Sequence, residues 1–344
     1  MKKFIPFLSL VLGLFVSQTF IACGGDSEED DSFVPVDGQT VSMPDYQATF
    51  TFINGAKEVE LTKATDQMGS IPEYVDYKGK QFRVTRIGDR SCQHLQYAFS
   101  EIPEGVVSIG EEAFEYHKAT SIKLPSTLKT IGAGAFCYNN NLENIAIPNG
   151  VTIIEPNTFL YNKNLISVTI PSKVAEIKEK AFSNTGLNSI VVPGSVKTIG
   201  EECFINCTSL KTATLEDGVT SIAYGAFSGC SKLAEISLPS SLTNIGEGVF
   251  FSCKSLVSIT IPENVKSIGA RTFCDAERVQ GGVVISSEDC LKEVISKIKE
   301  PFPIAKDVFG YNFLNYGILY VPKGTAEKYK TTEGWKEIKN IVEQ

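Results

Sequence analysis

Three evenly spaced cysteines are the side chains of this sequence that could most readily do chemistry. Cys207, Cys230 and Cys253 follow one another at intervals of 23 residues. Thiols in such a series could form disulfides between adjacent structural units, bind a metal ion, or lie buried and unreactive. A metal is the least favoured, because evenly spaced thiols lie in a row rather than converge, and His94 and His117 are the two histidines of the chain. We therefore expect neither a metal nor another cofactor.

Sequence patterns of known catalytic sites are missing. The chain has no His-Glu-x-x-His, no Gly-x-Ser-x-Gly and no glycine loop that could hold a phosphate. The stretch Gly132-Ala-Gly134 matches only the beginning of a dinucleotide-binding fingerprint. With two histidines, acid–base chemistry would depend on pairs of carboxylates. We therefore expect a protein that is not an enzyme.

The start of the chain has the pattern of a secretion signal. Lys2 and Lys3 precede an apolar stretch over residues 4–20, and Cys23 follows between small residues. The alternative is a membrane-spanning anchor, since the stretch approaches the length that crosses a bilayer. The cysteine and its neighbours resemble the lipobox of bacterial lipoproteins, in which the cysteine carries the lipid and begins the mature chain. This resemblance implies a signal peptide over 1–22 and lipid attachment at Cys23.

The segment after this cysteine begins with two glycines and continues as an acidic run. Such a composition cannot form a packed core, so residues 23–44 are predicted to be a solvated tether. An acidic run directly after a lipidated cysteine also resembles the surface-export signal of some Gram-negative lipoproteins, although a simple spacer would have the same composition. The resemblance implies an outer-membrane lipoprotein that is exposed on the cell surface.

The charge of the chain bears on its partners. The formal net charge is −8, and removal of the two lysines with the signal peptide changes it to −10. A nucleic-acid-binding protein needs a basic surface that neutralises phosphates. We therefore expect no nucleic-acid partner, and contact with the membrane through the N-terminal lipid alone.

A phrase of 22 or 23 residues recurs through most of the chain. An isoleucine marks each copy, and a phenylalanine follows all but the first isoleucine by five residues. The isoleucines are Ile87, Ile109, Ile131, Ile154, Ile177, Ile199, Ile222, Ile245 and Ile268, and the phenylalanines are Phe114, Phe136, Phe159, Phe182, Phe204, Phe227, Phe250 and Phe273. A repeat of this length indicates a solenoid, in which each coil packs on its neighbours.

One copy of the phrase, residues 131–152, shows how a coil is built. After the phenylalanine and a polar loop comes Leu-x-x-Ile-x-Ile-Pro, whose alternation predicts a short strand that the proline ends. Glu155 and Lys178 replace the glycine that follows the isoleucine elsewhere, so the turn cannot require a positive φ at that position. The sequence thus predicts a β-rich solenoid of about nine coils over residues 87–275.

Several phrases of the repeat resemble a known family. Residues 131–136, 222–230 and 233–239 are similar to the BspA-like leucine-rich repeat family of bacterial surface proteins, and the resemblance covers roughly residues 70–275. It implies a leucine-rich repeat fold, no catalytic residues, and a role in binding host proteins, other bacteria or matrix.

The resemblance also bears on the three cysteines. In leucine-rich repeats, the position three residues after the phenylalanine points inward and satisfies backbone groups of the loops. Asn139 and Asn162 hold this position in earlier copies. The resemblance therefore favours a ladder of buried amides and thiols, with disulfides between adjacent coils as the alternative.

Both ends of the solenoid need caps, because a bare end exposes apolar surface and strand edges. Residues 45–86 are predicted to form an N-terminal β cap of two hairpins, the first turning at Asn54 and Gly55 and the second over 75–82. Residues 276–344 are predicted to form a mixed C-terminal capping region.

Three features are expected inside this C-terminal region. A capping box at Ser286 and an apolar stripe from Leu291 predict a helical insertion over 286–299. Residues 319–322 repeat the strand pattern of a final coil. Short helices are predicted over 325–329 and 333–342, the second of which contains Trp335.

The outward positions of the predicted strands are the candidate binding face. They are nearly all small and polar, and they carry none of the Tyr, Trp or Arg residues that dominate most protein interfaces. The alternative is that Ser and Thr occupy them for strand propensity alone. The candidate residues are Ser121, Lys123, Asn144, Ser167, Thr169, Ser189, Thr212, Thr214, Glu235, Ser237, Ser258 and Thr260.

The function that these observations favour is binding or adhesion at the cell surface, with an unidentified protein or glycan as ligand. This function follows from the predicted anchor, tether and solenoid, and from analogy with the family. A structural scaffold or an accessory envelope protein that handles glycans is the alternative.

Overall fold

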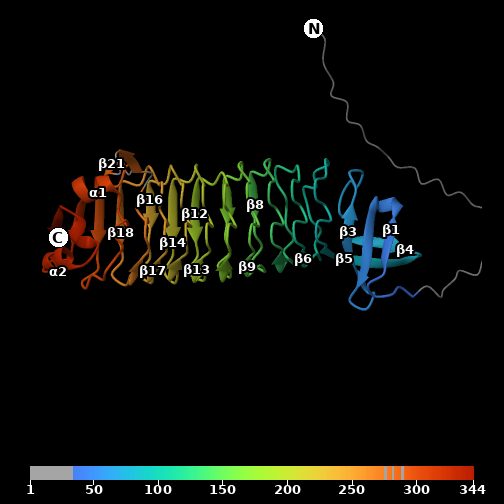
Figure 1. The fold of residues 1–344 in the computed structure, drawn as a ribbon. Helices are drawn as coiled ribbons and strands as arrows, with labels where there is room; N and C mark the ends of the chain where they lie inside the picture. Colours follow the sequence, from blue (N-terminus) through green and yellow to red (C-terminus); the bar gives the residue numbers. More distant parts are fainter. Residues whose placement is uncertain (1–33, 275–276, 281–282, 288–289) are drawn as a thin grey trace, which may run out of the picture. The chain divides into compact units, whose positions relative to one another are not determined.

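The computed structural model of the chain describes residues 34–274, 277–280, 283–287 and 290–344. Within the chain, Pro35–Gln344 form one compact unit that consists mainly of short strands (Figure 1). The predicted signal peptide, Cys23 and the first part of the tether lie outside the described residues, so these remain predictions.

The N-terminal cap consists of two antiparallel hairpins, as the sequence predicted. Strand β2 pairs with β3 across the turn at Asn54 and Gly55, and β4 pairs with β5. Because β3 also pairs in parallel with β5, both hairpins belong to one sheet. The elements are β1 (Thr40–Met43), η1 (Pro44–Tyr46), β2 (Ala48–Ile53), β3 (Glu58–Ala64), β4 (Tyr74–Tyr77) and β5 (Lys80–Ile87).

Strand β1 begins inside the segment that was predicted to be a tether. Val41 and Met43 are buried, and the strand pairs antiparallel with β2. The predicted tether boundary at residue 44 is therefore wrong, because two alternating apolar side chains already tie the chain to the sheet. The regular cap begins at Thr40.

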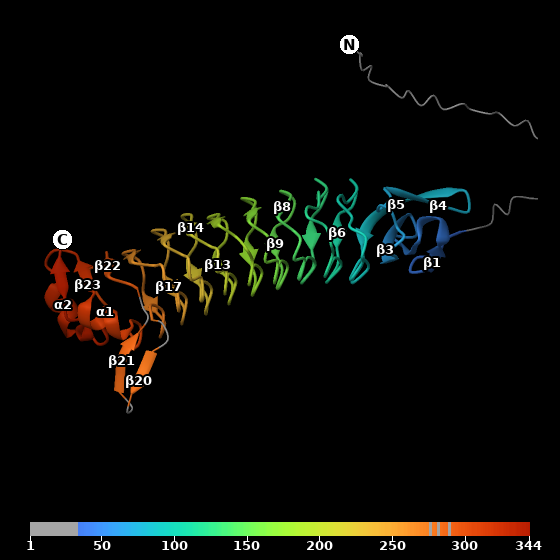
Figure 2. The ribbon, with the colours of Figure 1, turned by 90° about the horizontal axis from the view of Figure 1, so that it is seen from above.

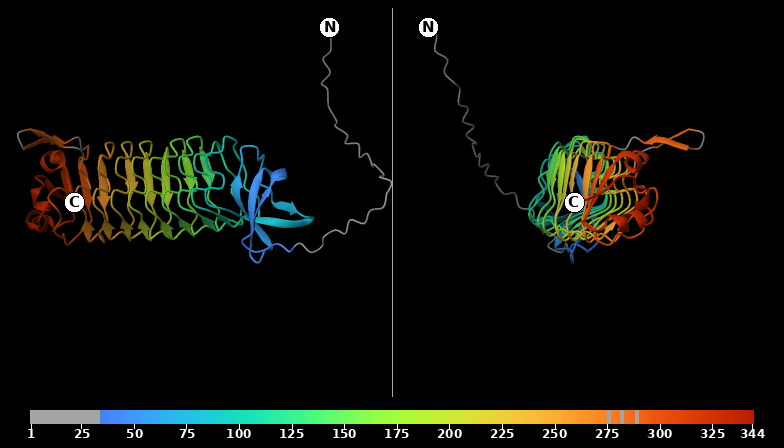
Figure 3. Two further views of the ribbon diagram at one scale, coloured as in Figure 1. Left: turned by 45° about the vertical axis from the view of Figure 1, so that its right-hand side comes forward. Right: turned by 90° about the vertical axis from the view of Figure 1, so that its left-hand side faces the viewer.

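Most coils of the solenoid contribute two strands, and each kind of strand forms its own row along the stack (Figures 1 and 3). The short-strand row comprises β6 (Ser108–Ile109), β7 (Thr130–Ile131), β9 (Ile153–Ile154), β11 (Glu176–Ile177), β13 (Thr198–Ile199), β15 (Ser221–Ile222), β17 (Asn244–Ile245) and β19 (Ser267–Ile268). The long-strand row comprises β8 (Asn144–Ala146), β10 (Ser167–Thr169), β12 (Ser189–Val192), β14 (Thr212–Leu215), β16 (Glu235–Ser237) and β18 (Ser258–Ile261).

All the pairs between coils are parallel and in register with the sequence repeat. In the short-strand row, Ile177 lies beside Ile199, which is the isoleucine of the next copy. In the long-strand row, Ile190 lies beside Ala213, and Ala213 beside Ile236. The repeat therefore sets the pairing, since a shift of one residue would turn every apolar side chain outward.

Each coil makes its tight turn at a position other than the recurring glycine. The residues after the isoleucines, such as Gly132 and Glu155, are not among those with positive φ, which confirms the prediction for this position. Left-handed φ values instead occur two residues before and two residues after the phenylalanine, as at Asn157 (57°) and Tyr161 (60°). The glycine has a packing role, because a Cβ on Gly132 would lie 2.6 Å from the backbone carbon of Gly110 in the preceding coil.

The core of the stack is an uninterrupted column of phenylalanine rings. Neighbouring rings from Phe114 to Phe309 stack with centroids 5.1 to 5.9 Å apart. Offset stacking of this kind adds about 0.5–1.5 kcal/mol per pair to the burial of the rings. Isoleucine, leucine and valine side chains of both strand rows are buried around the column.

The helix predicted over 286–299 is not formed, and this prediction was wrong. The spacing of apolar residues after Leu291, which was interpreted as one face of a helix, is also the spacing of the repeat strand. Strand β22 forms there and pairs in parallel with β18, while a hairpin of β20 and β21 precedes it and stands away from the coils in Figure 2. These elements are β20 (Glu277–Gln280), β21 (Val283–Ser287) and β22 (Glu293–Ser296).

The stack continues past the nine predicted coils, because β22, β23 and β24 extend the long-strand row beyond β18. The predicted final coil is confirmed by β23, and α2 confirms the first short helix. The helix predicted over 333–342 is wrong, since only a single turn forms before β24 pairs with β23. The elements are α1 (Tyr311–Tyr316), β23 (Ile318–Val321), α2 (Ala326–Thr331), η2 (Trp335–Glu337) and β24 (Ile341–Glu343).

Trp335 and Tyr329 close the C-terminal end of the core. Both side chains are fully buried, and their rings meet edge to face with centroids 5.1 Å apart. The indole N–H donates to the carbonyl of Phe302 at 2.9 Å, so the buried donor is satisfied. No helix in the described part of the chain is long and apolar enough to cross a membrane.

Candidate binding surfaces

The residues of the predicted binding face form a polar stripe along the long-strand row. Ten of its twelve residues are exposed, and Thr212 and Thr260 are half-buried. Strand pairing places them side by side, as in the series Ser189, Thr212 and Glu235. The stripe therefore offers hydroxyl groups that donate and accept hydrogen bonds on a flat and regular surface.

Contacts within the stripe involve short polar side chains. The hydroxyl of Ser167 donates to the Asn144 amide oxygen at 2.7 Å, and Lys123 pairs with Glu101 at 2.7 Å. Val191 also lies on this face with 53% of its surface exposed, although the sequence analysis did not include it. The face is thus more suited to many weak contacts than to one deeply buried anchor.

A buried ladder runs behind the adjacent loops, at the position three residues after each phenylalanine. In the N-terminal coils, the backbone N–H of His117 donates to the Asn139 amide oxygen, and the N–H of Asn139 donates to that of Asn162, both at 2.6 Å. The Asn162 amide nitrogen also donates to the carbonyl of Phe136 at 3.0 Å. These contacts confirm that amides at this position satisfy the loop backbone.

In the C-terminal coils, thiols occupy this position and form hydrogen bonds with the loop backbone. Cys207, Cys230 and Cys253 each donate to the carbonyl of the phenylalanine in the preceding coil, with sulfur–oxygen distances of 3.1, 3.1 and 3.3 Å. Cys207 and Cys230 are free thiols, so the buried ladder rather than a disulfide between them is what the structure contains. Burial raises the pKa of the Cys230 thiol, which keeps it protonated and unreactive.

A second ladder, which the sequence analysis missed, lies on the outside of the same loops. The rings of His94, Tyr116, Tyr138 and Tyr161 stack on one another with centroids 4.7, 4.9 and 5.1 Å apart. We call these four residues the tyrosine ladder. Each occupies the left-handed position two residues after the phenylalanine position, and this shared spacing is the signal that could have revealed them.

The tyrosine ladder is accessible to solvent. His94 and Tyr116 are exposed, Tyr116 to 37%, and Tyr138 and Tyr161 are half-buried. Burial raises the pKa of the Tyr138 phenol, so its hydroxyl remains protonated and can donate. Because stacking covers the ring faces, the ladder presents mainly ring edges and hydroxyl groups.

A polar hollow lies in the coils that follow the tyrosine ladder. It has a volume of about 370 Å³. We call this cavity the polar hollow, and the residues that line it are Lys163, Asn184, Thr185, Gly186, Asn206, Thr208 and Ser209. Asn184 and Asn206 occupy the same left-handed position as the tyrosines, so the hollow continues the ladder along the stack.

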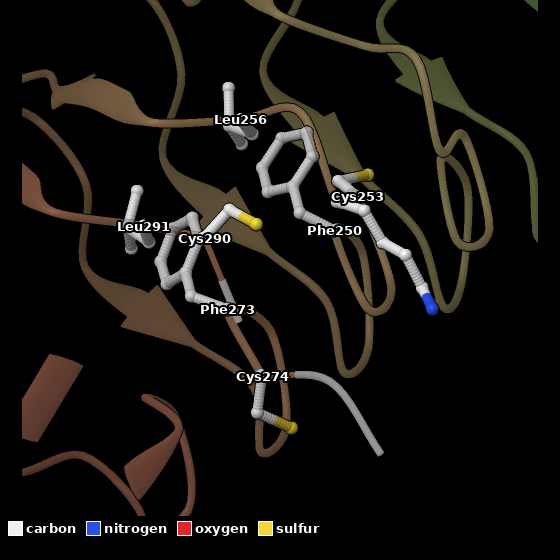
Figure 4. Close-up of a pocket in the computed structure, with 8 residues that line it drawn as sticks. Phe250, Cys253, Leu256, Phe273, Cys274, Cys290 and Leu291 are labelled. Atoms are coloured by element: carbon white, nitrogen blue, oxygen red, sulfur yellow. The ribbon is translucent and has the colours of Figure 1, made fainter. Parts of the chain in front are cut away.

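A smaller and more apolar cavity lies near the C-terminal end of the stack. Its volume is about 20 Å³, and Cys253, Cys274 and Cys290 line it together with Lys254, two phenylalanines and two leucines (Figure 4). In the described residues, no group of three or more His, Cys, Asp and Glu is placed to hold a metal.

Backbone N–H donors lower the pKa of Glu104 and Glu343, which is the opposite of the shift that a general acid requires.

Comparison with known sequences places the chain in a family. The sequence profile of the BspA type Leucine rich repeat region matches residues 85–211 and 176–287, with six copies of the repeat. The chain belongs to the BspA-type leucine-rich repeat family. No curated protein matches this leucine-rich repeat chain.

Solved structures of bacterial leucine-rich repeat proteins are similar to this one. A leucine-rich repeat protein from Bacteroides ovatus shares 22% identity over 87% of this chain and 98% of its own, with a TM-score of 0.49. The pneumococcal vaccine antigen PcpA shares 20% identity over 90% and 100%, with a TM-score of 0.46. The leucine-rich repeat protein of T. pallidum shares 23% identity over 63% and 91%, with a TM-score of 0.44.

This leucine-rich repeat protein therefore presents three distinct features on its coils. The polar stripe covers the long-strand row, and the tyrosine ladder and the polar hollow lie on the neighbouring loops. The buried amides and thiols behind those loops fix the backbone that carries all three.

Proposed function

We propose that the protein binds a protein or glycan ligand through the surface of its solenoid and does so without catalysis. The observation that supports this proposal is the unbroken stack of coils, which sets exposed polar side chains in register over many strands. A rigid surface of this kind loses little conformational entropy when it binds. Membership of a repeat family fits the same conclusion.

We also propose that the protein is displayed on the bacterial outer membrane through lipid at Cys23. The proposal is supported by the sequence pattern around this cysteine and by the acidic run that follows it. Mass spectrometry of the N-terminal peptide should find a lipidated Cys23 as the first residue. Protease treatment of intact cells should then release the protein, and an N-terminus that retains residues 1–22 would contradict the proposal.

A binding panel tests the function itself. The fragment 24–344 contains the compact unit Pro35–Gln344 and would be presented to immobilised matrix proteins and to glycans. We expect at least one saturable binder. Replacement of neighbouring stripe residues, Thr214→Arg with Ser237→Arg, should weaken binding to a matrix protein, because two bulky cations would stand on the flat face.

The matched control lies on the other strand row. Thr198→Arg with Ser267→Arg adds the same groups at exposed positions of the short-strand row, and binding should remain unchanged. If no component of a broad panel binds, the binding function fails and a scaffold role becomes the better explanation. Equal loss of binding in both double variants would show that the long-strand face is not the site.

A further inference from the structure

The polar hollow has a local cause in the sequence. Phe182 and Leu187 are separated by one residue fewer than Phe159 and Leu165 in the preceding coil. The shorter loop packs closely against the preceding coil at Gly186, where a Cβ would lie 2.2 Å from the carbonyl oxygen of Lys163. Because the loops on either side keep their full length, the hollow is built into the backbone rather than left by a movable side chain.

The groups that line the hollow define the chemistry of its ligand. Asn184 and Asn206 bring amides, and Thr208 and Ser209 bring hydroxyls, so neutral donors and acceptors lie on several sides. Among the lining residues, Lys163 is the one that carries a charge. A ligand rich in hydroxyl groups, with or without an acidic substituent, suits this set better than a cation or an apolar group.

The tyrosine ladder supplies the second and independent observation. Its rings repeat every 4.7 to 5.1 Å along the stack, which is close to the length of one pyranose unit in an extended sugar chain. In the described residues, no ring stacks on the side of Tyr161 that faces the next coil, where Asn184 takes the place of a fifth aromatic residue. An aromatic ring beside amide and hydroxyl groups is a surface that can pack a sugar ring and bond its hydroxyls.

We propose that the tyrosine ladder and the polar hollow form one binding site for a linear oligosaccharide that lies along the stack. The tyrosine hydroxyls bond successive sugar units, and the hollow takes the unit beyond Tyr161. This inference rests on the proposed binding function and names its ligand class, but it assigns the ligand to the loops rather than to the polar stripe.

The test measures binding of named sugar chains to the fragment 24–344. Fluorescently labelled cellohexaose, xylohexaose, chitohexaose and hexagalacturonic acid are titrated while fluorescence anisotropy is recorded. At least one should bind with a saturable isotherm. Tyr161→Ala should lower its affinity about tenfold, as loss of one good aromatic contact would. Tyr161→Phe keeps the ring and should lose less.

Further variants separate the site from the general surface. Lys163→Ala with Thr208→Ala changes two exposed side chains of the hollow and should also weaken binding. If circular dichroism shows that Tyr161→Ala does not fold, this pair alone tests the oligosaccharide site. Tyr316→Ala is the control, since Tyr316 is 74% exposed on α1 and lies outside the site. Its affinity should match that of the unmodified fragment.

Two results would overturn the proposal. One is the absence of saturable binding to every probe, and the other is binding that neither Tyr161→Ala nor the hollow pair changes. Matrix-protein binding, measured on the same preparation, separates this failure from that of the proposed function. Retained protein binding without sugar binding would reject the oligosaccharide site alone, and loss of both would reject both.

Discussion

The N-terminal and C-terminal coils fill the same buried position with different chemistry. His117, Asn139 and Asn162 hold it in the first part of the stack, and Cys207 and Cys230 hold it in the second. The amides accept from backbone N–H groups of the preceding coil, and Asn162 also donates to one of its carbonyls, whereas the thiols donate to its carbonyls. The position therefore demands a small buried group that forms hydrogen bonds, and the fold accepts either polarity of bond.

The largest expected effect tests what the two parts share. Phe159→Ala and Phe227→Ala should each destabilise the fold by about 3–5 kcal/mol, because both rings are fully buried in the same column. Chemical denaturation followed by circular dichroism measures the change. A clear difference between the two variants would show that the parts differ in core packing as well. Tyr316→Ala, on the surface, should change stability little.

Within the buried ladder, the pH dependence of stability should come from the N-terminal part. Burial lowers the pKa of His117 to about 4, from an ordinary value near 6.5. Between these values the unfolded chain binds a proton that the folded chain does not, so stability falls as pH drops from 6.5 to 4, by roughly 3 kcal/mol. His117→Gln keeps an acceptor for the N–H of Phe99 and should remove this loss.

The measurement for this prediction is the free energy of unfolding of both proteins at several pH values between 7.5 and 4. The two proteins share every other titratable group, so the difference between them isolates His117. A difference that does not change with pH would contradict the buried neutral imidazole.

A smaller effect compares the two kinds of hydrogen bond directly. Asn162→Ala leaves the N–H of Asn139 and the carbonyl of Phe136 without partners and should cost about 2–4 kcal/mol. Cys230→Ala leaves one carbonyl without a weak thiol donor and should cost about 1–2 kcal/mol. Denaturation of both variants gives the order, and a reversed order would mean that the thiols carry more of the stability than the amides.

The smallest expected effect is that the buried thiols do not react with a labelling reagent in the native protein. Cys203 and Cys230 are fully buried, and burial raises the pKa of both thiols. A maleimide reagent should leave the peptides that contain them unmodified in the native protein and modify them after denaturation. Peptide mass mapping makes the comparison. Rapid native labelling of Cys230 would show that the ladder opens to solvent.

The repeat made most of the fold predictable. Its isoleucines and phenylalanines recur at a fixed spacing, so every coil places them at the same positions of the core. The hairpin that turns at Asn54 and Gly55 was equally clear, since turn chemistry and alternation agreed. The residues after Leu291 were wrongly predicted to be helical because leucine followed by an apolar residue three positions later fits both a helix and a coil of this repeat. Pairing with β18 decides between them, and no local pattern contains that information.

The candidate surface was only partly predictable. Strand alternation correctly placed Ser189 and Thr214 on the outside of the long-strand row. The tyrosine ladder was overlooked because aromatic residues in loops do not alternate, and only comparison of the same position across copies aligns Tyr116 with Tyr138. The hollow depends on a single missing loop residue before Leu187, whose effect appears only when three coils are seen together.

The hairpin of β20 and β21 has a consequence for how such a protein can change. Phe273 stacks directly on Phe309 with centroids 5.3 Å apart, although the hairpin and β22 lie between them in the chain. The column of rings is thus continuous past the inserted hairpin, while β22 is the long strand of the next coil. The coil boundary next to Phe273 is therefore a natural place to graft a foreign loop, for example an epitope, without rebuilding the scaffold.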